Sequence, residues 1–219
     1  MRCAVLGTGT VGATVAGALV GVGHEVRMGS RTADNETAAV WAMRHGEPAS
    51  HGTFADAAGF GEVVVNATSG MASLLALEAA GRENLAGKVV VDIANPLDFS
   101  HGFPPSLSVC NTDSLGEQIQ RAFPAARVVK TLNTVAAAVM VDPQQLESAT
   151  DVFLCGDDAS AKQVVRELLV QLGWESGHVL DLGGIVSARA TEMYLPLWLS
   201  IMSAGGTPVF NVTVRRAHE

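Results

Sequence analysis

Short apolar runs alternate with longer segments of mixed polarity along most of the chain. The short runs are typical of buried strands, because each spans only a few residues and is rich in aliphatic side chains. Strands are expected at residues 2–6, 25–28, 52–54, 63–65, 88–92, 127–130, 152–155 and 175–180. Helices are expected at residues 11–22, 32–44, 55–60, 71–80, 112–123, 159–172 and 184–204, and a long loop at residues 97–111.

Strands that alternate with helices predict an α/β fold with an open, doubly wound and mostly parallel sheet, covered by helices on both faces. The strands after residue 150 are expected to extend the same sheet, because no linker is evident before them. We expect residues 1–180 to form one domain with an extended sheet, and residues 181–219 a small helical segment. That segment is expected to bend, or to start a new helix, at Pro196.

The first strand is followed directly by the glycine-rich turn Gly7-Thr8-Gly9-Thr10-Val11-Gly12. The spacing G-x-G-x-x-G between a strand and a helix is the context in which this motif binds a dinucleotide. Gly7 permits the tight turn, Gly9 lets the backbone approach a pyrophosphate, and Gly12 lets the helix pack on the strand. The N-terminal N–H groups of the helix then face the anion. The turn predicts a Rossmann-type domain; a glycine-rich turn without a ligand is the alternative.

The end of the second strand favours NADP over NAD. An NAD site usually has an acidic residue there, which binds the ribose 2′-hydroxyl and would repel a 2′-phosphate. This chain has Gly29-Ser30-Arg31-Thr32 instead. Ser30 can donate a hydrogen bond to a phosphate, and Arg31 can make a bidentate contact. Asp34 is expected to lie in the first helical turn and to point away. A solvated arginine at a helix start is the alternative for Arg31.

Neutral polar residues follow the fourth, fifth and sixth strands: Thr68-Ser69, Asn95-Pro96 and Thr131-Leu132-Asn133-Thr134. Ligands of an open α/β sheet lie beyond the carboxyl ends of its strands. A neutral site suits hydride transfer between two carriers, because the cofactors supply the reactivity and the protein holds their rings together. Ordinary turn capping is the alternative for each Asn and Thr.

No Ser–His–Asp set, Cys–His set or H-x-x-x-H spacing is apparent in the chain. We therefore expect no catalytic acid or base and no metal site. The net charge of −8 and the lack of any lysine and arginine run also disfavour binding to nucleic acid.

Cysteine usage and hydropathy indicate a soluble cytoplasmic protein. Cys3, Cys110 and Cys155 form no C-x-x-C pair, which is typical of reduced thiols in the cytosol. The chain starts directly in a strand, so no signal peptide is expected. The longest apolar stretch, at residues 193–204, is interrupted by Pro196 and is too short to span a bilayer.

Several segments are characteristic in combination: the Gly-Thr-Gly turn and residues 29–31, 130–134, 152–158, 187–189 and 196–197. Together they resemble the NADP-dependent coenzyme F420 oxidoreductase family. The same segments resemble the NADPH-binding domain of the STEAP metalloreductases, which pass a hydride to a flavin and continue into membrane helices that are not expected here. The resemblance implies hydride transfer between NADP(H) and the deazaflavin coenzyme F420, and a homodimer.

The resemblance also implies roles for particular residues. Residues 8–11 would hold the pyrophosphate, and Ser30 and Arg31 the 2′-phosphate. Ala137 would lie near the nicotinamide, with Gly205-Gly206 in a loop near the deazaflavin. At Asn133 the chain departs from the archaeal members, which have histidine there.

Two other functions fit the same residues. One is an NADPH-dependent flavin or ferric reductase, and the other is a non-catalytic NADPH-sensing module. A hydroxyacid or imine dehydrogenase ranks last, because it needs a large substrate domain with a catalytic lysine or histidine, and too few residues follow Thr131 to form one.

Overall fold

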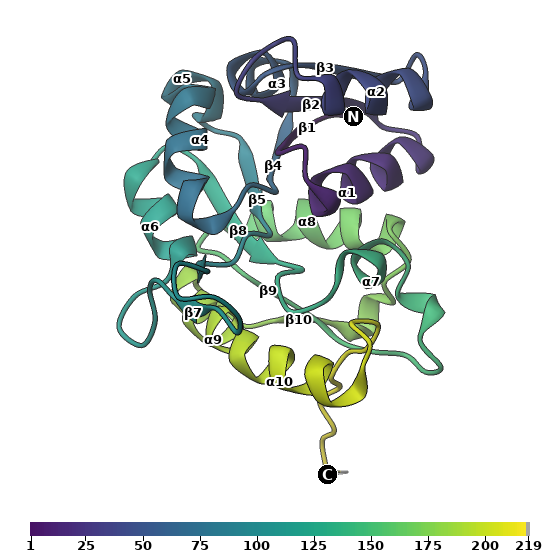
Figure 1. Ribbon diagram of the computed structural model, residues 1–219, viewed down its shortest axis with the longest axis vertical. Helices are drawn as coiled ribbons and strands as arrows, with labels where there is room; N and C mark the ends of the chain where they lie inside the picture. The colour runs from purple at the N-terminus through teal and green to yellow at the C-terminus, as the bar shows by residue number, and fades with distance from the viewer. Residues whose placement is uncertain (218–219) are drawn as a thin grey trace.

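The computed structural model describes residues 1–217 and has an eight-stranded sheet at its centre (Figure 1). The strand order is β10-β9-β8-β5-β4-β1-β2-β3. The strands of this sheet are β1 (Arg2–Leu6), β2 (Glu25–Ser30), β3 (Ala49–Thr53), β4 (Val63–Asn66), β5 (Val89–Asp92), β8 (Arg127–Thr131), β9 (Val152–Cys155) and β10 (Val179–Asp181).

All neighbours from β3 to β8 are parallel, whereas β8 and β9 are antiparallel. β10 runs parallel to β9, so both of these strands run antiparallel to the other six. The predicted α/β fold with a mostly parallel Rossmann-type sheet is confirmed. The expected extension of the sheet after residue 150 is also confirmed.

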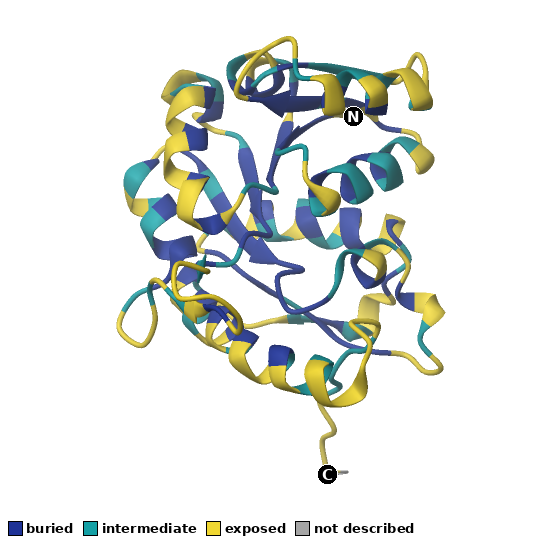
Figure 2. Ribbon diagram, in the orientation of Figure 1, coloured by how far each residue is buried: buried dark blue, intermediate teal, exposed yellow. Residues whose placement is uncertain are grey.

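Helices cover both faces of the sheet, and the strands between them are buried (Figure 2). One face packs against α1 (Thr10–Gly21), α2 (Glu36–His45), α7 (Ala137–Val141) and α8 (Ala159–Gln171). The other packs against α3 (Phe54–Phe60), α4 (Ser73–Ala80), α5 (Arg82–Leu85), α6 (Leu115–Ala122) and α9 (Ala188–Met193). α10 (Leu195–Gly205) follows α9 and lies along the end of the molecule opposite β3 (Figure 1).

The strand residues divide between the two faces with a period of two. Cys3 and Val5 of β1 belong to the core on the α1 side, whereas Ala4 and Leu6 belong to the core on the α3 side. Successive side chains of a strand point to opposite faces, so a strand buried on both sides must be apolar throughout. This is why continuous apolar runs predicted the strands.

Two predicted helix starts are wrong, and in both cases a different residue caps the helix. α2 begins at Glu36, because the Oδ1 of Asn35 accepts a hydrogen bond from the backbone N of Ala38 at 2.9 Å. Asp34 therefore lies in the exposed turn before α2 and not in its first turn. α6 is capped by Ser114, not by residues 112–113, since its Oγ accepts from the N of Glu117 at 3.1 Å.

Other differences concern short elements. The expected loop at residues 97–111 contains a small hairpin of β6 (Leu97–Asp98) and β7 (Ser106–Leu107). The last strand is shorter than predicted, because residues 176–178 form a 3-10 turn before Val179. α7 is a single short helix that the hydrophobic pattern did not indicate.

Candidate functional site

In the turn between β1 and α1, two glycines are tightly packed against the backbone and a third faces open space. Gly7 has φ +118°, and a Cβ there would lie 2.5 Å from the carbonyl O of Ala67 in the loop after β4. A Cβ at Gly12 would lie 2.2 Å from the O of Gly7, so Gly12 packs against the turn itself. No atom lies within 4 Å of a Cβ built at Gly9. Gly9 is also the N-cap of α1 and provides no side-chain cap, so the first N–H groups of the helix are free to bind an anion.

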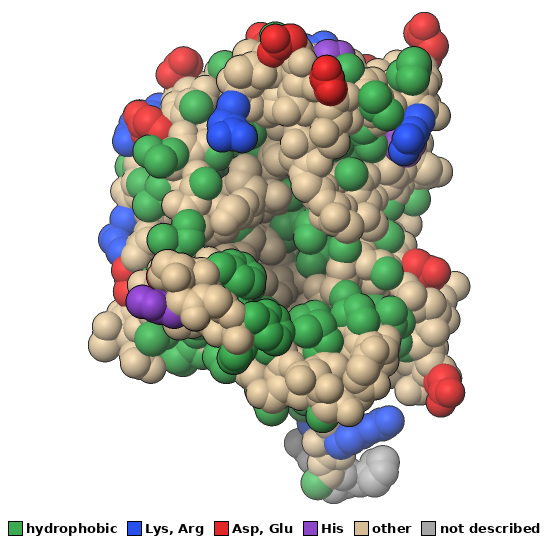
Figure 3. Space-filling model, in the orientation of Figure 1, with side chains coloured by type: hydrophobic (Ala, Val, Ile, Leu, Met, Phe, Trp, Pro, Cys, Tyr) green, Lys and Arg blue, Asp and Glu red, His purple; other side chains and the backbone are tan. Residues whose placement is uncertain are grey.

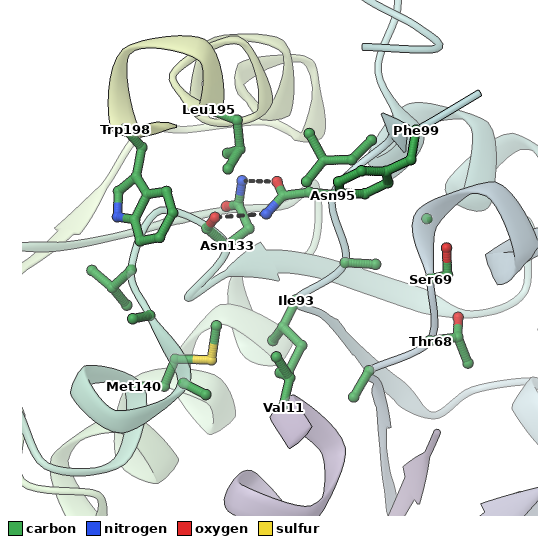
Figure 4. Close-up of a pocket in the computed structure, with 17 residues that line it drawn as sticks. Val11, Thr68, Ser69, Ile93, Asn95, Phe99, Asn133, Met140, Leu195 and Trp198 are labelled. Carbon is green, nitrogen blue, oxygen red and sulfur yellow. Dashed lines mark hydrogen bonds between the residues drawn. The ribbon is translucent and has the colours of Figure 1, made fainter. Parts of the chain in front are cut away.

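Two adjoining cavities open along the carboxyl edge of the sheet, and both are lined by residues 67–69. The glycine-turn cavity has a volume of about 680 Å³ and is lined by Gly7, Thr8, Gly9, Ser30, Arg31, Asn35, Phe54, Ala67, Thr68, Ser69, Ala72, Leu75, Ala76 and Ala79. The Trp198 cavity has a volume of about 500 Å³ and is lined by Val11, residues 67–70, Ile93, Ala94, Asn95, Leu97, Phe99, Asn133, residues 135–137, Met140, Leu195 and Trp198 (Figure 4). Figure 3 shows a hollow in the middle of the molecule, with hydrophobic side chains along its rim.

The residue directly after β2 brings a cationic side chain to the glycine-turn cavity. Arg31 is exposed and lines the cavity, whereas Ser30 is only 4% exposed. The Oγ of Ser30 donates its hydrogen to the carbonyl O of Thr32, which shapes the turn. Asn35 also lines the cavity, a position that sequence reasoning missed. The hydroxyl hydrogen that was expected to bind a ligand is therefore used within the chain.

Thr68 lines both cavities and is held by a buried polar network. Its Oγ1 donates to the Oδ1 of Asn66 at 2.7 Å. The Nδ2 of Asn66 donates in turn to the Oγ of Ser73 at 3.0 Å and to the Oδ1 of Asp92 at 2.8 Å. Because Asn66 and Asp92 end the adjacent strands β4 and β5, the network fixes Thr68 relative to the sheet.

The loops after β4 and β5 touch at a glycine that sequence reasoning missed. A Cβ at Gly70 would lie 2.0 Å from the carbonyl O of Asn95, so only glycine fits there without a shift of the backbone. The position of Gly70 directly after Thr68-Ser69 was the signal available in the sequence.

Asn95 and Asn133 both line the Trp198 cavity, and they bind each other (Figure 4). Asn133 is 3% exposed, and its Nδ2 also donates to the carbonyl O of Thr191 in α9 at 3.0 Å. Its amide hydrogens are therefore used to hold the loops after β5 and β8 against α9.

Large apolar side chains complete the Trp198 cavity. Leu195 and Trp198 come from α10, Phe99 from the hairpin loop, and Met140 from α7, next to the small Ala137 (Figure 4). The resemblance implies that Ala137 lies near the nicotinamide, whereas none of the four large side chains was predicted. A chain with only 5% aromatic residues gives some signal at Trp198 and Phe99, yet nothing local shows which way they point.

Among the described residues, five of the predicted site residues line neither cavity. Gly206 has φ +69° and caps the end of α10, where both terminal glycines are exposed. The carbonyl O of Pro96 accepts from the N of Ser108 at 2.8 Å, within the hairpin. The five residues are Thr10, Gly12, Pro96, Gly205 and Gly206.

A buried ion cluster lies beneath the site. The Nζ of Lys130 is 2.8 Å from the Oδ2 of Asp92 and 2.8 Å from the Oε1 of Glu192, and it also donates to the carbonyl O of Ala94. Burial alone would lower the pKa of Lys130, but the two carboxylates raise it. Burial raises the pKa of Glu192, whose Oε2 accepts from the N of Leu115 at 2.8 Å. The cluster joins β5, β8, α6 and α9.

Among residues 1–217, no His, Cys, Asp and Glu side chains form a group of three or more that could hold a metal ion. No helix in this part of the chain has both the length and the apolar character needed to cross a membrane.

Comparisons with known proteins agree with the resemblance stated above. The family model for coenzyme F420-dependent NADP oxidoreductases matches residues 2–96. The crystal structure of a candidate F420-dependent NADP reductase from Arthrobacter sp. FB24 has a TM-score of 0.92 and 53% identity, and the alignment covers 99% of this chain and 100% of that one.

Two curated relatives are more distant. The metalloreductase STEAP3 of Rattus norvegicus is 30% identical over 205 residues, which are 90% of this chain and 38% of the relative. The F420-dependent NADP reductase of Methanocaldococcus jannaschii is 31% identical over 121 residues, which are 55% of this chain and 53% of the relative. The chain thus spans about half of one curated relative and less of the other. The 53% identity to the Arthrobacter structure, over the whole of that chain, carries the assignment. The chain belongs to the family of coenzyme F420-dependent NADP oxidoreductases.

Proposed function

We propose that the protein transfers a hydride between NADP(H) and coenzyme F420 in the two adjoining cavities. The observation that carries the proposal is their shared wall, residues 67–69, which joins an anion-binding turn to an apolar cavity. An extended dinucleotide fits this arrangement, because its phosphates and its nicotinamide need such surroundings at opposite ends. The family and the 53% identical Arthrobacter structure support the same function.

The chain's own residues fit NADP(H) at the glycine-turn cavity. The open space above Gly9 and the uncapped N-terminus of α1 suit a pyrophosphate bound across residues 8–11. Arg31 is placed to bind a 2′-phosphate, and Asn35 lines the same cavity. Thr68 and Ser69 lie where the two cavities meet and would bind the part of the cofactor between adenosine and nicotinamide.

The Trp198 cavity would hold the two rings between which the hydride passes. When bound, the nicotinamide and the deazaflavin supply the redox chemistry. Every described residue that lines this cavity is neutral. We infer that no side chain acts as an acid or base, and that Val11, Ala137 and Trp198 exclude water and hold the rings in contact. The hydrogen bonds between Asn95 and Asn133 hold together the two loops that would contact the rings.

The alternative function is an NADPH-dependent flavin or ferric reductase, which the 30% identity to metalloreductase STEAP3 favours. A non-catalytic NADPH sensor is the third candidate. An assay of NADPH oxidation with F420, FMN, FAD and Fe(III) in parallel separates the three. We expect F420 to be reduced fastest, with stereospecific delivery of deuterium from labelled NADPH. Reduction of flavin or Fe(III) but not of F420 would support the alternative. If none of the four acceptors is reduced, the non-catalytic sensor is favoured.

We also propose that residues 1–180 bind NADP(H) and that residues 181–217 close the acceptor side, since Leu195 and Trp198 come from the second part. The last two residues of the expected segment, 218–219, lie outside the described residues. A homodimer is proposed from the resemblance, and a cytoplasmic location from the cysteine usage. Exposed apolar side chains at Phe99, Phe103 and Leu197 support an interface between protomers. Light scattering after size-exclusion chromatography tests the dimer, and a mass of one chain would contradict it.

A further inference from the structure

Trp198 forms the α10 side of the Trp198 cavity. It lies one helical turn after Leu195, and both side chains line the cavity (Figure 4). The indole Nε1 is buried and has no hydrogen-bond partner among residues 1–217. The position of the indole therefore depends on packing and not on a hydrogen bond.

The ring that packs against Trp198 comes from the C-terminal segment. Phe210 stacks on the indole with 5.4 Å between ring centroids and an interplanar angle of 22°. Gly206, in the left-handed conformation, ends α10 and lets the chain turn back toward the molecule. Phe210 is thereby placed outside the cavity, in contact with the residue that forms its wall.

The segment that carries Phe210 is anchored at the start of β9. Asp151 is 3% exposed, and its Oδ2 accepts from the backbone N of Val214 at 2.6 Å. Its backbone O accepts from the Nδ2 of Asn211 at 2.7 Å. The remaining carboxylate oxygen, Oδ1, is 2.8 Å from the Nδ1 of His178, which fixes the Asp151 side chain. Asp151 thus holds residues 210–214, the C-terminal arm, at two points, and Thr150 beside it bonds to Val212 and Thr213.

We propose that the C-terminal arm is a positioning element for the hydride-acceptor site: Asp151 anchors it, and Phe210 holds Trp198 in place as the wall against which a planar ring acceptor packs. This proposal rests on the proposed function, because it assigns the Trp198 cavity to the acceptor. Phe210 is a positioning residue, since it does not line the cavity itself. Trp198 is the residue that touches the acceptor. The arm therefore affects acceptor binding and leaves the glycine-turn cavity, which is built from other loops, unchanged.

The test compares Phe210→Ala with Phe210→Tyr, which keeps the aromatic stack, and with Val209→Ala, an exposed neighbour outside the arm. Phe210→Ala should raise the KM for F420 by roughly two- to tenfold, the effect of losing one aromatic pair. The Kd for NADPH should stay within about twofold, because its contacts lie elsewhere. Phe210→Tyr should restore the wild-type KM, and Val209→Ala should not change it. Asn211→Ala should raise the KM less than Phe210→Ala, because the bond between Val214 and Asp151 remains.

A second measurement does not depend on activity. The fluorescence of Trp198 is obtained as the difference between each protein and its Trp198→Phe counterpart. In Phe210→Ala the indole should be quenched more strongly by acrylamide and should emit at longer wavelength. Unchanged quenching, or equal loss of NADPH and acceptor binding, would overturn the proposal. If the wild type does not reduce F420 at all, the proposed function fails, and quenching alone still decides whether the arm holds Trp198.

Discussion

The side-chain amides of Asn95 and Asn133 bind each other's loops reciprocally. The Nδ2 of Asn95 donates to the backbone O of Asn133 at 2.8 Å, and the Nδ2 of Asn133 donates to the Oδ1 of Asn95 at 2.9 Å. These two residues follow the adjacent strands β5 and β8. The pair therefore fixes the distance between two loops that line the Trp198 cavity, and it does so with neutral groups.

Asn133→Ala removes the donor to both Asn95 and Thr191. Leaving buried acceptors without a partner costs about 1–3 kcal/mol, so the free energy of unfolding should fall by that amount. Turnover should fall as well, because α9 and the β5 loop lose a shared contact. Urea unfolding and steady-state kinetics measure the two effects. Gln163→Ala, on the exposed side of α8, is the control and should change stability by less than about 0.5 kcal/mol.

Arg31→Ala should weaken NADPH binding by about 1.5–3 kcal/mol, the usual range for hydrogen bonds to a charged group. NADH binding should be nearly unchanged, since NADH lacks the 2′-phosphate. Calorimetric titration with both cofactors tests this. Arg44→Ala removes an exposed arginine from α2 and should affect neither cofactor. Equal weakening of NADPH and NADH in Arg31→Ala would contradict the assignment.

Gly9→Val should abolish cofactor binding without unfolding the protein. A side chain at Gly9 meets no protein atom within 4 Å, so it would occupy the space proposed for the pyrophosphate. Gly21→Val, at an equally open position, should bind NADPH normally. Circular dichroism and calorimetric titration measure folding and affinity. Retained affinity in Gly9→Val would show that the dinucleotide binds elsewhere.

Ala137→Leu should reduce kcat by about 100-fold or more, because a small displacement of the reacting groups has an effect of that order. Ala137 lines the Trp198 cavity at the start of α7, whereas its neighbour Ala138 is exposed. Ala138→Leu is therefore a matched control that should keep normal turnover. The Kd for NADPH should change little in either variant. Normal turnover in Ala137→Leu would show that the rings lie elsewhere.

Lys130→Met leaves the carboxylates of Asp92 and Glu192 buried together without a cation. Loss of one partner from a buried ion pair costs about 3–5 kcal/mol. Lys162→Met, which breaks the more exposed pair with Asp181, should cost no more than about 1 kcal/mol. Thermal and urea unfolding test both variants.

The loss of unfolding free energy caused by Lys130→Met should depend on pH. Burial raises the pKa of Glu192, so the folded state binds a proton more tightly than the unfolded state does. Stability from such a group increases as the pH falls toward its unfolded pKa. The difference between wild type and Lys130→Met should therefore be smaller at pH 5 than at pH 8. If Lys130→Met does not fold, the double variant Lys130→Met/Glu192→Gln should recover part of the stability. A pH-independent penalty would contradict this account.

The sequence predicted those features that depend on local patterns. The glycine turn could be located because Gly7 to Gly12 lie within one strand–helix junction. The strands could be located because both faces of the sheet are buried, so each strand is a continuous apolar run. The direction of β9 could not be predicted, since an apolar run has the same pattern whichever way it runs. The predicted starts of α2 and α6 were wrong, because several residues could cap each helix and only the fold selects Asn35 and Ser114.

The candidate site was predicted in part for the same reason. Thr68, Asn95 and Asn133 follow strands whose carboxyl ends meet, so their proximity follows from topology. Trp198 and Phe99 lie on segments whose position depends on tertiary packing. The contact of Lys130 with Glu192 joins residues that are distant in the sequence, and neither residue has a neighbour that indicates the other.

The reversed direction of β9 brings the beginning of that strand, not its end, to the edge of the sheet where the cavities open. Thr131 pairs with Leu154, so the chain before Val152, including Asp151, lies beyond the carboxyl end of β8. The C-terminal segment is thereby anchored at the same edge of the sheet as the glycine turn, although the two lie at opposite ends of the chain.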